Sequence, residues 1–255
     1  MSIGKRMLRR SVWLLPLLLL SMTGCLSTDD RCEEFTPDIT LDELEKKMLQ
    51  ARDPQGVFQK AKSYVQKQVV TTGRQKALCE VKFLAPDRFK LVTLKDNEPE
   101  TAIILNGDRA WLVNYPKRSV TPITGESLFQ LQTMSRLGNP DDSYQDLFQQ
   151  VVLTGCRIDD REYYKLNCTS KLPDEPPMYL YIGKNNFLLK RVRIPAPVNY
   201  ESTIERYALY EGVMIPETTV IDNNGVRQSS KIYENKLNAD LDESEFLPPV
   251  FPSAD

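Results

Sequence analysis

Five cysteines and the absence of histidine limit the chemistry that this chain of 255 residues can perform. Without an imidazole, the chain is excluded from the Ser-His and Cys-His hydrolases, from the His-ligated zinc enzymes and from imidazole-based pH switches. The cysteines are Cys25, Cys32, Cys79, Cys156 and Cys168, and no two of them have the CxxC-type spacing of a metal site. Their positions therefore favour acylation or disulfide formation.

Clustered carboxylates are the second group that could do chemistry. Asp159 and Asp160 lie in a predicted turn, and residues 240–245 form an acidic stretch near the end of the chain. Paired carboxylates serve glycosidases as acid and base, but neither cluster has aromatic cleft residues beside it. The second cluster also lacks the alternating ligands and glycine of a calcium loop. Glycine-rich phosphate loops are absent as well. We interpret these carboxylates as solvated, and we predict no enzyme activity, no cofactor and no metal.

The charge balance argues against a nucleic-acid partner. The chain has 33 basic and 35 acidic residues, and four of the basic ones lie among its first ten residues. Without those four, 29 basic residues face 35 acidic ones, a net charge of -6. Phosphate contacts need an excess of basic groups, which this body does not offer. Its 41% hydrophobic and 27% charged residues are typical of a globular protein.

The first 24 residues have the layout of a secretory signal peptide. A basic start at residues 5–10 precedes an apolar run at residues 12–22 and the small-residue exit Thr23-Gly24. The run is shorter than the roughly 20 apolar residues of a membrane-spanning helix and contains Pro16. Together with Cys25 the exit resembles a bacterial lipobox, although Met22 stands where leucine is usual. The alternative is ordinary cleavage nearby, with Cys25 as a bystander.

Acylation of Cys25 would turn the mature chain into a tethered domain. Two or three acyl chains, at ~0.8 kcal/mol per buried methylene, anchor a protein stably to a membrane. We therefore expect a signal peptide over residues 1–24, a lipidated tether over residues 25–38 and one folded domain over residues 39–255. Leu26 follows the cysteine. By resemblance to the enterobacterial sorting rule, this residue favours an outer-membrane anchor with the domain facing the periplasm.

An even number of cysteines after Cys25 indicates two disulfides in an exported chain, with three pairings open. Residues 156–168 have turn formers in the middle and apolar or aromatic flanks, which predicts a hairpin. Cys156 and Cys168 could then face each other within the roughly 4.4–6.8 Å Cα separation of a disulfide. A bond between Cys32 and Cys79 follows by elimination.

The hydrophobic pattern predicts a mostly β protein with a few helices. Thr40 and Glu43 form a capping box before a helix over residues 41–52, and a second short helical stretch covers residues 57–62. Short alternating segments with turn signals every 8–12 residues then indicate an antiparallel sheet or barrel. The expected strands are residues 62–71, 75–84, 87–95, 100–106, 109–115, 118–122, 151–158, 162–170, 178–183, 186–195, 201–211, 214–222 and 226–235.

Residues 126–150 interrupt these strands with two stretches of helical spacing, separated by Gly138-Asn139-Pro140. We interpret them as two short amphipathic helices that cap one end of a hydrophobic core. In the tail, we expect Phe246 to dock on the sheet. No linker divides the chain after residue 40, so a single domain is predicted.

Several segments in order along the chain carry a family resemblance. Residues 85–90 read APDRFK, residues 100–116 read ETAIILNGDRAWLVNYP, and residues 179–190 read YLYIGKNNFLLK. Residues 210–216 read YEGVMIP, and residues 246–249 read FLPP. These segments resemble the periplasmic lipoprotein carrier and receptor proteins, LolA and LolB, and the broader outer-membrane lipoprotein-sorting family.

The resemblance implies a fold of the α+β class that is mostly β. Its architecture would be a single curved antiparallel sheet, an open half-barrel, with short helices covering the concave face. It further implies a cavity that binds acyl chains of lipoproteins or other lipids, with a periplasmic carrier protein as a partner. The arginine that tunes lid closure in the carrier corresponds to Ala85, so that role does not transfer. The alternative function is an envelope-stress sensor or assembly factor that uses the same fold to bind protein partners.

Alternation along four predicted strands yields candidate lipid-binding residues, although the sequence does not indicate which face is concave. In each strand we select two apolar residues that share a face. The alternative is that these residues only pack a core. The candidates are Val81, Phe83, Phe89, Leu91, Ile103, Leu105, Trp111 and Val113.

Overall fold

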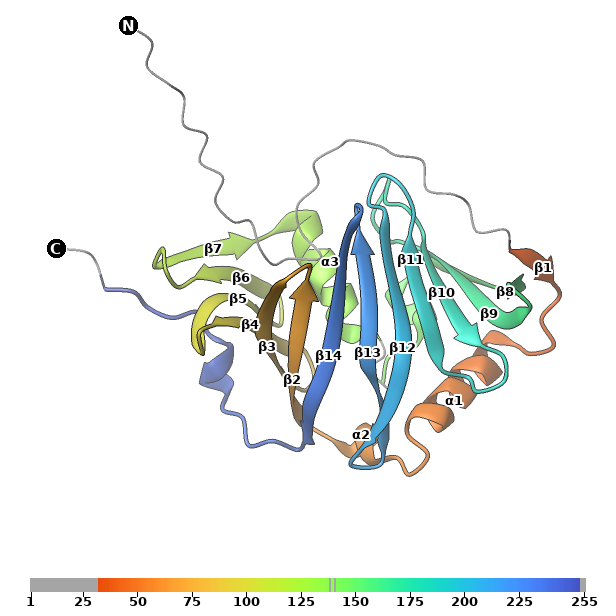
Figure 1. Ribbon diagram of the computed structural model, residues 1–255, viewed down its shortest axis with the longest axis horizontal. Helices are drawn as coiled ribbons and strands as arrows, with labels where there is room; N and C mark the ends of the chain where they lie inside the picture. Colours follow the sequence, from red (N-terminus) through yellow and green to blue (C-terminus); the bar gives the residue numbers. More distant parts are fainter. Residues whose placement is uncertain (1–31, 138, 140, 253–255) are drawn as a thin grey trace, which may run out of the picture.

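The computed structural model describes residues 32–137, 139 and 141–252 (Figure 1). Within these residues, fourteen strands form one antiparallel sheet in the order β1-β8-β9-β10-β11-β12-β13-β14-β2-β3-β4-β5-β6-β7. The strands are β1 (Glu33–Phe35), β2 (Ser63–Thr72), β3 (Gln75–Leu84), β4 (Arg88–Lys95), β5 (Glu98–Asn106), β6 (Arg109–Asn114), β7 (Ser119–Ile123), β8 (Gln150–Ile158), β9 (Arg161–Thr169), β10 (Met178–Gly183), β11 (Leu189–Ile194), β12 (Tyr200–Tyr210), β13 (Val213–Asn223) and β14 (Val226–Leu237). The helical elements are α1 (Leu41–Arg52), α2 (Val57–Lys60), α3 (Gly125–Arg136), α4 (Tyr144–Leu147) and the 3-10 turn η1 (Glu243–Phe246). The predicted signal peptide and Cys25 lie outside the described residues.

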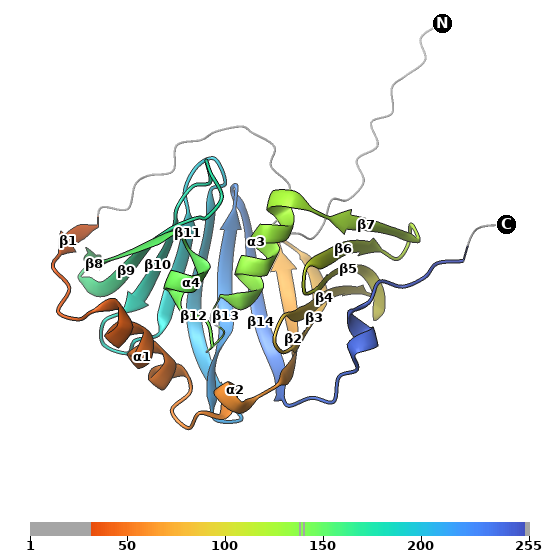
Figure 2. The same ribbon diagram turned by 180° about the vertical axis from the view of Figure 1, so that it is seen from behind.

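The sheet bends around α3 and α4, which lie on one side of it (Figure 2). Leu131 of α3 packs in a cluster with Ile103 and Leu105 of β5, near one edge of the sheet. Leu147 of α4 packs in a cluster with Leu180 of β10, in the other half of the strand order. Two helices next to each other in the chain reach both halves only because the sheet is strongly curved. The edge strands β1 and β7 are not paired with each other within the described residues, so the curve is open. The predicted fold class is confirmed.

Local sequence explains where the elements begin and turn. The predicted capping box of α1 is present: Glu43 N donates to Thr40 Oγ1 at 3.3 Å, and Thr40 N donates to Glu43 Oε2 at 3.0 Å. The hairpin between β5 and β6 turns at Gly107, whose φ of 62° lies in the left-handed region that glycine adopts without strain. Asn106 and Arg109 form the last pair before this turn.

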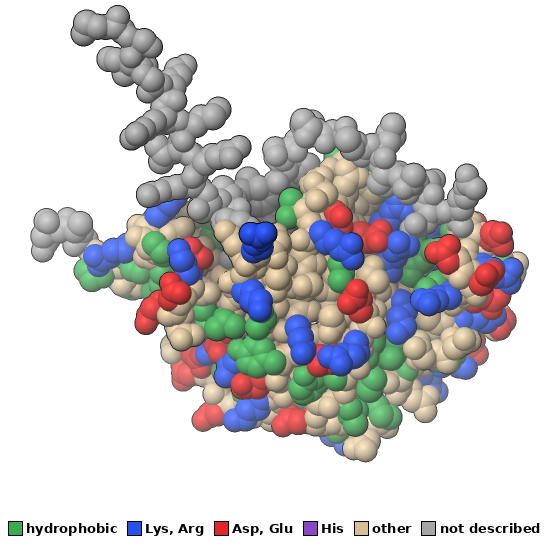
Figure 3. Space-filling view, in the orientation of Figure 1, with side chains coloured by type: hydrophobic (Ala, Val, Ile, Leu, Met, Phe, Trp, Pro, Cys, Tyr) green, Lys and Arg blue, Asp and Glu red, His purple; other side chains and the backbone are tan. Residues whose placement is uncertain are grey.

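The C-terminal segment covers the face of β4 and β5 that is turned away from α3. Phe246 is fully buried there in a cluster with Ile104 and Val113, which confirms its predicted docking on the sheet. Lys82 Nζ reaches Glu245 Oε2 at 2.5 Å and fixes the same turn to β3. Figure 3 shows this outer side of the molecule, where Lys, Arg, Asp and Glu side chains are interspersed.

The predicted tether ends earlier than expected. Residues 33–35 form β1, which pairs with β8 through Glu34 opposite Cys156. Residues 33–35, which fall within the predicted tether, are therefore part of the sheet. Two of the three residues of β1 are glutamates, so hydrophobic alternation gives no signal for this strand.

The predicted disulfide pairing is wrong. Cys32 is bonded to Cys156, with Cα atoms 5.5 Å apart, whereas Cys79 and Cys168 are buried free thiols. The hairpin of β8 and β9 exists, but its register places Cys156 opposite Tyr163 and Cys168 opposite Val151. Cys156 and Cys168 are thus several positions out of register and point to opposite faces, so they cannot bond. Burial raises the pKa of both free thiols, to about 12 for Cys168.

Candidate functional site

Two adjoining cavities lie between the helices and the inner face of the sheet. The first has a volume of about 780 Å³ and lies between α2, α3 and strands β2, β3 and β5. The second has a volume of about 730 Å³ and lies between α1, α4 and strands β2, β12, β13 and β14. Because they share lining residues, we treat them as one continuous space. The shared residues are Phe58, Tyr64, Asn139, Asp141, Asp142 and Asp146.

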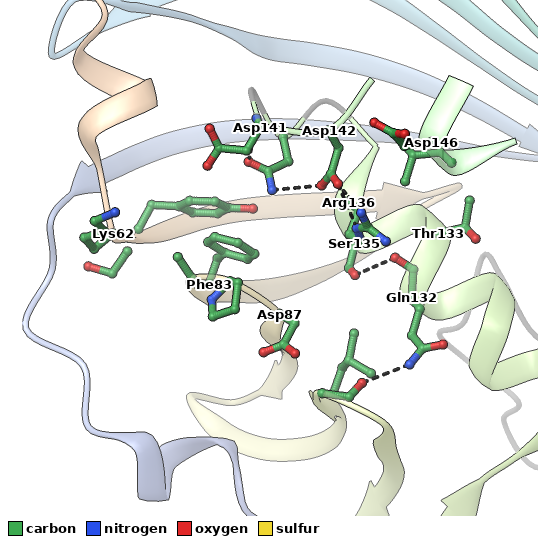
Figure 4. A pocket seen from close by; sticks show the side chains of 18 of the residues that line it. Lys62, Phe83, Asp87, Gln132, Thr133, Ser135, Arg136, Asp141, Asp142 and Asp146 are labelled. Atoms are coloured by element: carbon green, nitrogen blue, oxygen red, sulfur yellow. Dashed lines mark hydrogen bonds and ion pairs between the residues drawn. The ribbon is translucent and has the colours of Figure 1, made fainter. Parts of the chain in front are cut away.

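The first cavity has α3 on one side and strand residues on the other. Figure 4 shows Gln132 and Thr133 of α3 across the space from Phe83 of β3 and Lys62. Gln132 Nε2 donates to the carbonyl of Gly107 at 3.0 Å, which joins α3 to the turn between β5 and β6. This hydrogen bond fixes the middle of α3 over the sheet.

A polar cluster follows α3 at the rim of the same cavity. Arg136 Nε donates to Asp142 Oδ1 at 3.0 Å, and Asn139 Nδ2 donates to Asp142 Oδ2 at 3.0 Å (Figure 4). Asp146 Oδ2 accepts from the Ser143 hydroxyl at 2.7 Å, which lowers the pKa of Asp146, and Asp146 N donates to Ser143 Oγ at 3.1 Å at the start of α4. The rim between α3 and α4 is therefore charged, with the charges held by local partners.

The second cavity contains a cation and three tyrosines. The Arg52 guanidinium lies 4.3 Å from the ring centroid of Phe58, and Tyr64, Tyr144 and Tyr207 are close enough to influence its charge. Burial lowers the pKa of Arg52 and raises the pKa of all three phenols. This part of the space thus places aromatic rings around the Arg52 guanidinium.

The described residues hold no group of three or more carboxylate or thiol side chains placed to share a metal ion. The cavity lining instead combines aromatic and aliphatic side chains with many polar and charged groups. A concave space of this volume is typical of a site for an elongated or drug-sized organic ligand.

Comparison with known proteins rests on structure, because no family model matches the sequence and no curated protein sequence matches it. A domain from Vibrio parahaemolyticus assigned to outer membrane lipoprotein sorting superposes with a TM-score of 0.55 at 13% identity, covering 81% of this chain and 97% of that chain. A LolA superfamily protein from Nitrosomonas europaea gives a TM-score of 0.54 at 16% identity, covering 82% of this chain and 98% of that chain.

A DUF1329 family protein from Desulfovibrio piger also gives a TM-score of 0.54, at 11% identity, covering 81% of this chain and 97% of that chain. Each of the three superpositions covers nearly the whole length of the other protein. The protein has a LolA-like fold. The family resemblance seen in the sequence is therefore confirmed at the level of the fold.

Six of the eight candidate residues share the inner face of this LolA-like sheet. Phe83 is opposite Phe89, and Phe89 is opposite Leu105, so these side chains form a row across β3, β4 and β5. Phe83 and Leu105 line the first cavity. The other four inner candidates are Val81, Phe89, Leu91 and Ile103.

The other two candidates are on the wrong face. Trp111 is opposite Ile104 and Val113 is opposite Ala102, which places both on the outer side, in contact with the cluster around Phe246. Alternation correctly puts Trp111 and Val113 together. Both faces of β5 are apolar: α3 covers one face, and the C-terminal segment covers the other. The apolar pattern of β5 therefore does not indicate which face is the inner one.

Sequence reasoning missed the polar end of the second cavity, formed by Arg52, Tyr64, Tyr207 and Asn235. A signal for Arg52 does exist. Leu44, Met48 and Arg52 are spaced by four residues, so the arginine continues the stripe that faces the sheet. A charged residue in such a stripe indicates a polar group inside the fold.

Proposed function

We propose that this chain is a membrane-anchored envelope lipoprotein whose cavity binds acyl chains of lipoproteins or other lipids. Its role would be in lipoprotein sorting or in lipid transfer at the outer membrane, without covalent catalysis. The observation that carries the proposal is the pair of adjoining cavities between the inner face of an open curved sheet and the helices that cover it. The fold it shares with a lipoprotein-sorting domain and a LolA superfamily protein supports the same function.

The energetics of acyl chains suit a half-open cavity. A palmitoyl-sized chain of about 15 methylenes carries ~12 kcal/mol of transfer free energy, at ~0.8 kcal/mol for each methylene. Escape into water is then too slow to be useful, so a carrier or receptor must shield the chain. Phe83, Leu105 and Phe129 offer apolar contact in the first cavity. Lys62 and Asp87 are among the residues that make part of the lining polar, which would keep binding weaker than insertion into a membrane.

The anchor in this proposal is the acylated thiol of Cys25. Within the described ranges, no helix combines the length and the apolar character needed to cross a bilayer. Acyl chains on Cys25 would hold the domain, whose strand β1 starts at Glu33, close to the membrane surface. A partner that delivers or receives lipid, such as a periplasmic carrier protein, would then meet the domain there.

A narrowed cavity tests the proposal directly. Thr133 lies on α3 and lines the first cavity, so Thr133→Trp would fill part of the space. Glu126 is exposed in the first turn of the same helix, which makes Glu126→Trp the matched control. We expect wild type and Glu126→Trp to bind a fluorescent fatty acid equally, and Thr133→Trp to bind it at least about tenfold more weakly.

Native mass spectrometry of the full chain purified from cells supplies the second readout. Co-purified lipid in wild type, reduced in Thr133→Trp, supports the proposal. Absence of co-purified lipid together with absence of fatty-acid uptake contradicts it. Recovery of a membrane-anchored regulatory protein in a pull-down, with no lipid bound, would instead support the alternative of an envelope-stress sensor or assembly factor.

A further inference from the structure

Arg52 is a charged side chain in the cavity wall, where most of its neighbours are aromatic. It ends α1 on the stripe that begins with the fully buried Leu44, so the helix carries it into the space between α1 and the sheet. Its guanidinium lies over the ring of Phe58. Burial lowers the pKa of Arg52, yet a guanidinium stays protonated at neutral pH because its ordinary pKa is so high.

Asp53 follows Arg52 in the chain and fixes the next helix. Asp53 is buried, and its two oxygens accept hydrogen bonds from Val57 N at 2.8 Å and Gln59 N at 3.0 Å. These bonds fix the start of α2 beside α1. The charge of Asp53 also offsets part of the desolvation of Arg52.

Asn235 provides an independent sign of a ligand in the same cavity. The residue is 8% exposed, and its buried Nδ2 has no hydrogen-bond partner among the described residues. Asn235 of β14 is opposite Gln66 of β2, and both line the second cavity. An unmet buried donor costs free energy, and native proteins rarely keep one without a hydrogen-bond partner. The group that would satisfy it is an acceptor oxygen inside the cavity.

We infer that Arg52 and Asn235 bind the oxyanion head, a carboxylate or a phosphate, of an acyl-chain ligand. This inference rests on the proposed function and adds the chemical class of the ligand head. Guanidinium and amide N–H groups only donate, so together they select an acceptor with several lone pairs. The acidic residues that line the same cavity are Asp42 and Glu45 of α1, Asp141 and Asp142 of the connection between α3 and α4, and Asp146 of α4, whereas Asn235 comes from β14.

The test compares two probes that differ only in the head group: 11-(dansylamino)undecanoic acid and its methyl ester. The variants are Arg52→Met and Asn235→Leu, and the control is Lys60→Met, which removes an exposed positive charge from α2 outside the cavity lining. We expect Arg52→Met to weaken binding of the acid by about tenfold or more and binding of the ester by less than about threefold. Asn235→Leu should weaken binding of the acid but not of the ester, and Lys60→Met should change the affinity for neither probe.

Three outcomes overturn the inference. Equal loss of acid and ester in Arg52→Met would assign Arg52 a structural role, and unchanged binding of both probes would exclude it from the site. Equal binding of acid and ester by wild type would leave the proposed function standing without a head-group site. If wild type binds neither probe, the result contradicts the proposed function itself. Thermal melting reports whether Arg52→Met is folded; if it is not, Asn235→Leu carries the test.

Competitors identify the source of the oxyanion. Displacement of the dansyl acid by palmitate alone assigns the site to fatty-acid carboxylates, and displacement by palmitoyl lysophosphatidic acid assigns it to lipid phosphates. Both results support the inference. Displacement by inorganic phosphate without an acyl chain would contradict it, because the site would then be independent of the lipid.

Discussion

The ring of Phe35 lies directly over Gly155, where a β-carbon would come within 2.2 Å of the ring. These two residues are partners in the pairing of β1 with β8. The close approach lets the aromatic ring cover the inner side of the sheet edge, beside Lys184, whose Nζ is 5.0 Å from the ring centroid. Glycine at this position is therefore required by packing, since its backbone conformation is ordinary.

Replacement of this glycine should displace β1. We expect Gly155→Ala to destabilise the protein by about 1–3 kcal/mol, because backbone and ring must move apart. The measurement is the free energy of unfolding in urea. In a Phe35→Ala background the same glycine substitution should cost less than half as much. Equal costs in both backgrounds would show that the ring does not contact Gly155.

Loss of the disulfide should destabilise the same edge. Cys32 and Cys156 close a long loop, with a sequence separation of 124. Cross-links of this kind typically contribute about 2–4 kcal/mol by restricting the unfolded chain. We expect Cys156→Ser to lose this amount of stability, and we expect the stability of the variant to be unaffected by a reductant. Peptide mapping of wild type should recover Cys32 joined to Cys156, and a peptide that joins Cys156 to Cys168 would contradict the pairing.

The outer face can be separated from the cavity by one substitution. Phe246 is fully buried against β4 and β5 on the side away from α3. Phe246→Ala should cost about 3–5 kcal/mol of stability, as expected for a large buried ring. Binding of a fluorescent fatty acid should stay within about twofold of wild type at temperatures where the variant is folded. Val250, 93% exposed in the same segment, makes Val250→Ala the control. A large loss of affinity in Phe246→Ala would show that the ligand occupies the outer face.

Stability should fall on the alkaline side. Burial raises the pKa of Cys168 to about 12, and burial together with the hydrogen bond to Asp38 raises the pKa of Tyr164 to about 12. Both folded pKa values lie above the ordinary values of 9.0 and 10.0. The associated stability is therefore complete below about pH 9 and is lost as the pH rises towards 12.

The urea midpoint, measured from pH 8 to pH 11.5, checks this expectation. Cys168→Ala should lose less stability across the window than wild type does. Thiolate absorbance at 240 nm should appear near the ordinary thiol pKa only in the urea-unfolded chain. Ionisation of Cys168 near pH 9 in the folded protein would contradict the burial of its sulfur.

Much of the fold could be predicted because the strands are short and their turns are marked. The alternation of apolar residues locates every strand from β2 onwards to within a few residues, and the capping box locates α1. The strand β1 could not be predicted, because Glu33 and Glu34 give no apolar alternation and the pairing depends on a disulfide between distant residues. Local sequence also predicts the turn between β8 and β9 correctly, but it does not determine the register that decides which cysteines share a face.

The candidate site could be predicted only in part. The row of Phe83, Phe89 and Leu105 follows from period-two alternation, whereas the position of Trp111 depends on which side α3 covers. Asn235 was missed for a different reason. Its polarity within β14 resembles that of any solvent-facing residue, and its place in the cavity wall depends on pairing with β2, which is far away in the sequence.

In the part of the chain that the structure describes, the edge strands β1 and β7 are not hydrogen-bonded to each other, so the sheet forms an open arc. The diameter of a closed barrel is set by its number of strands and their stagger. An arc has no such constraint, so small changes in twist between neighbouring strands can widen or narrow it while every ladder remains intact. An open sheet of this shape can therefore adjust to ligands of different size without unfolding.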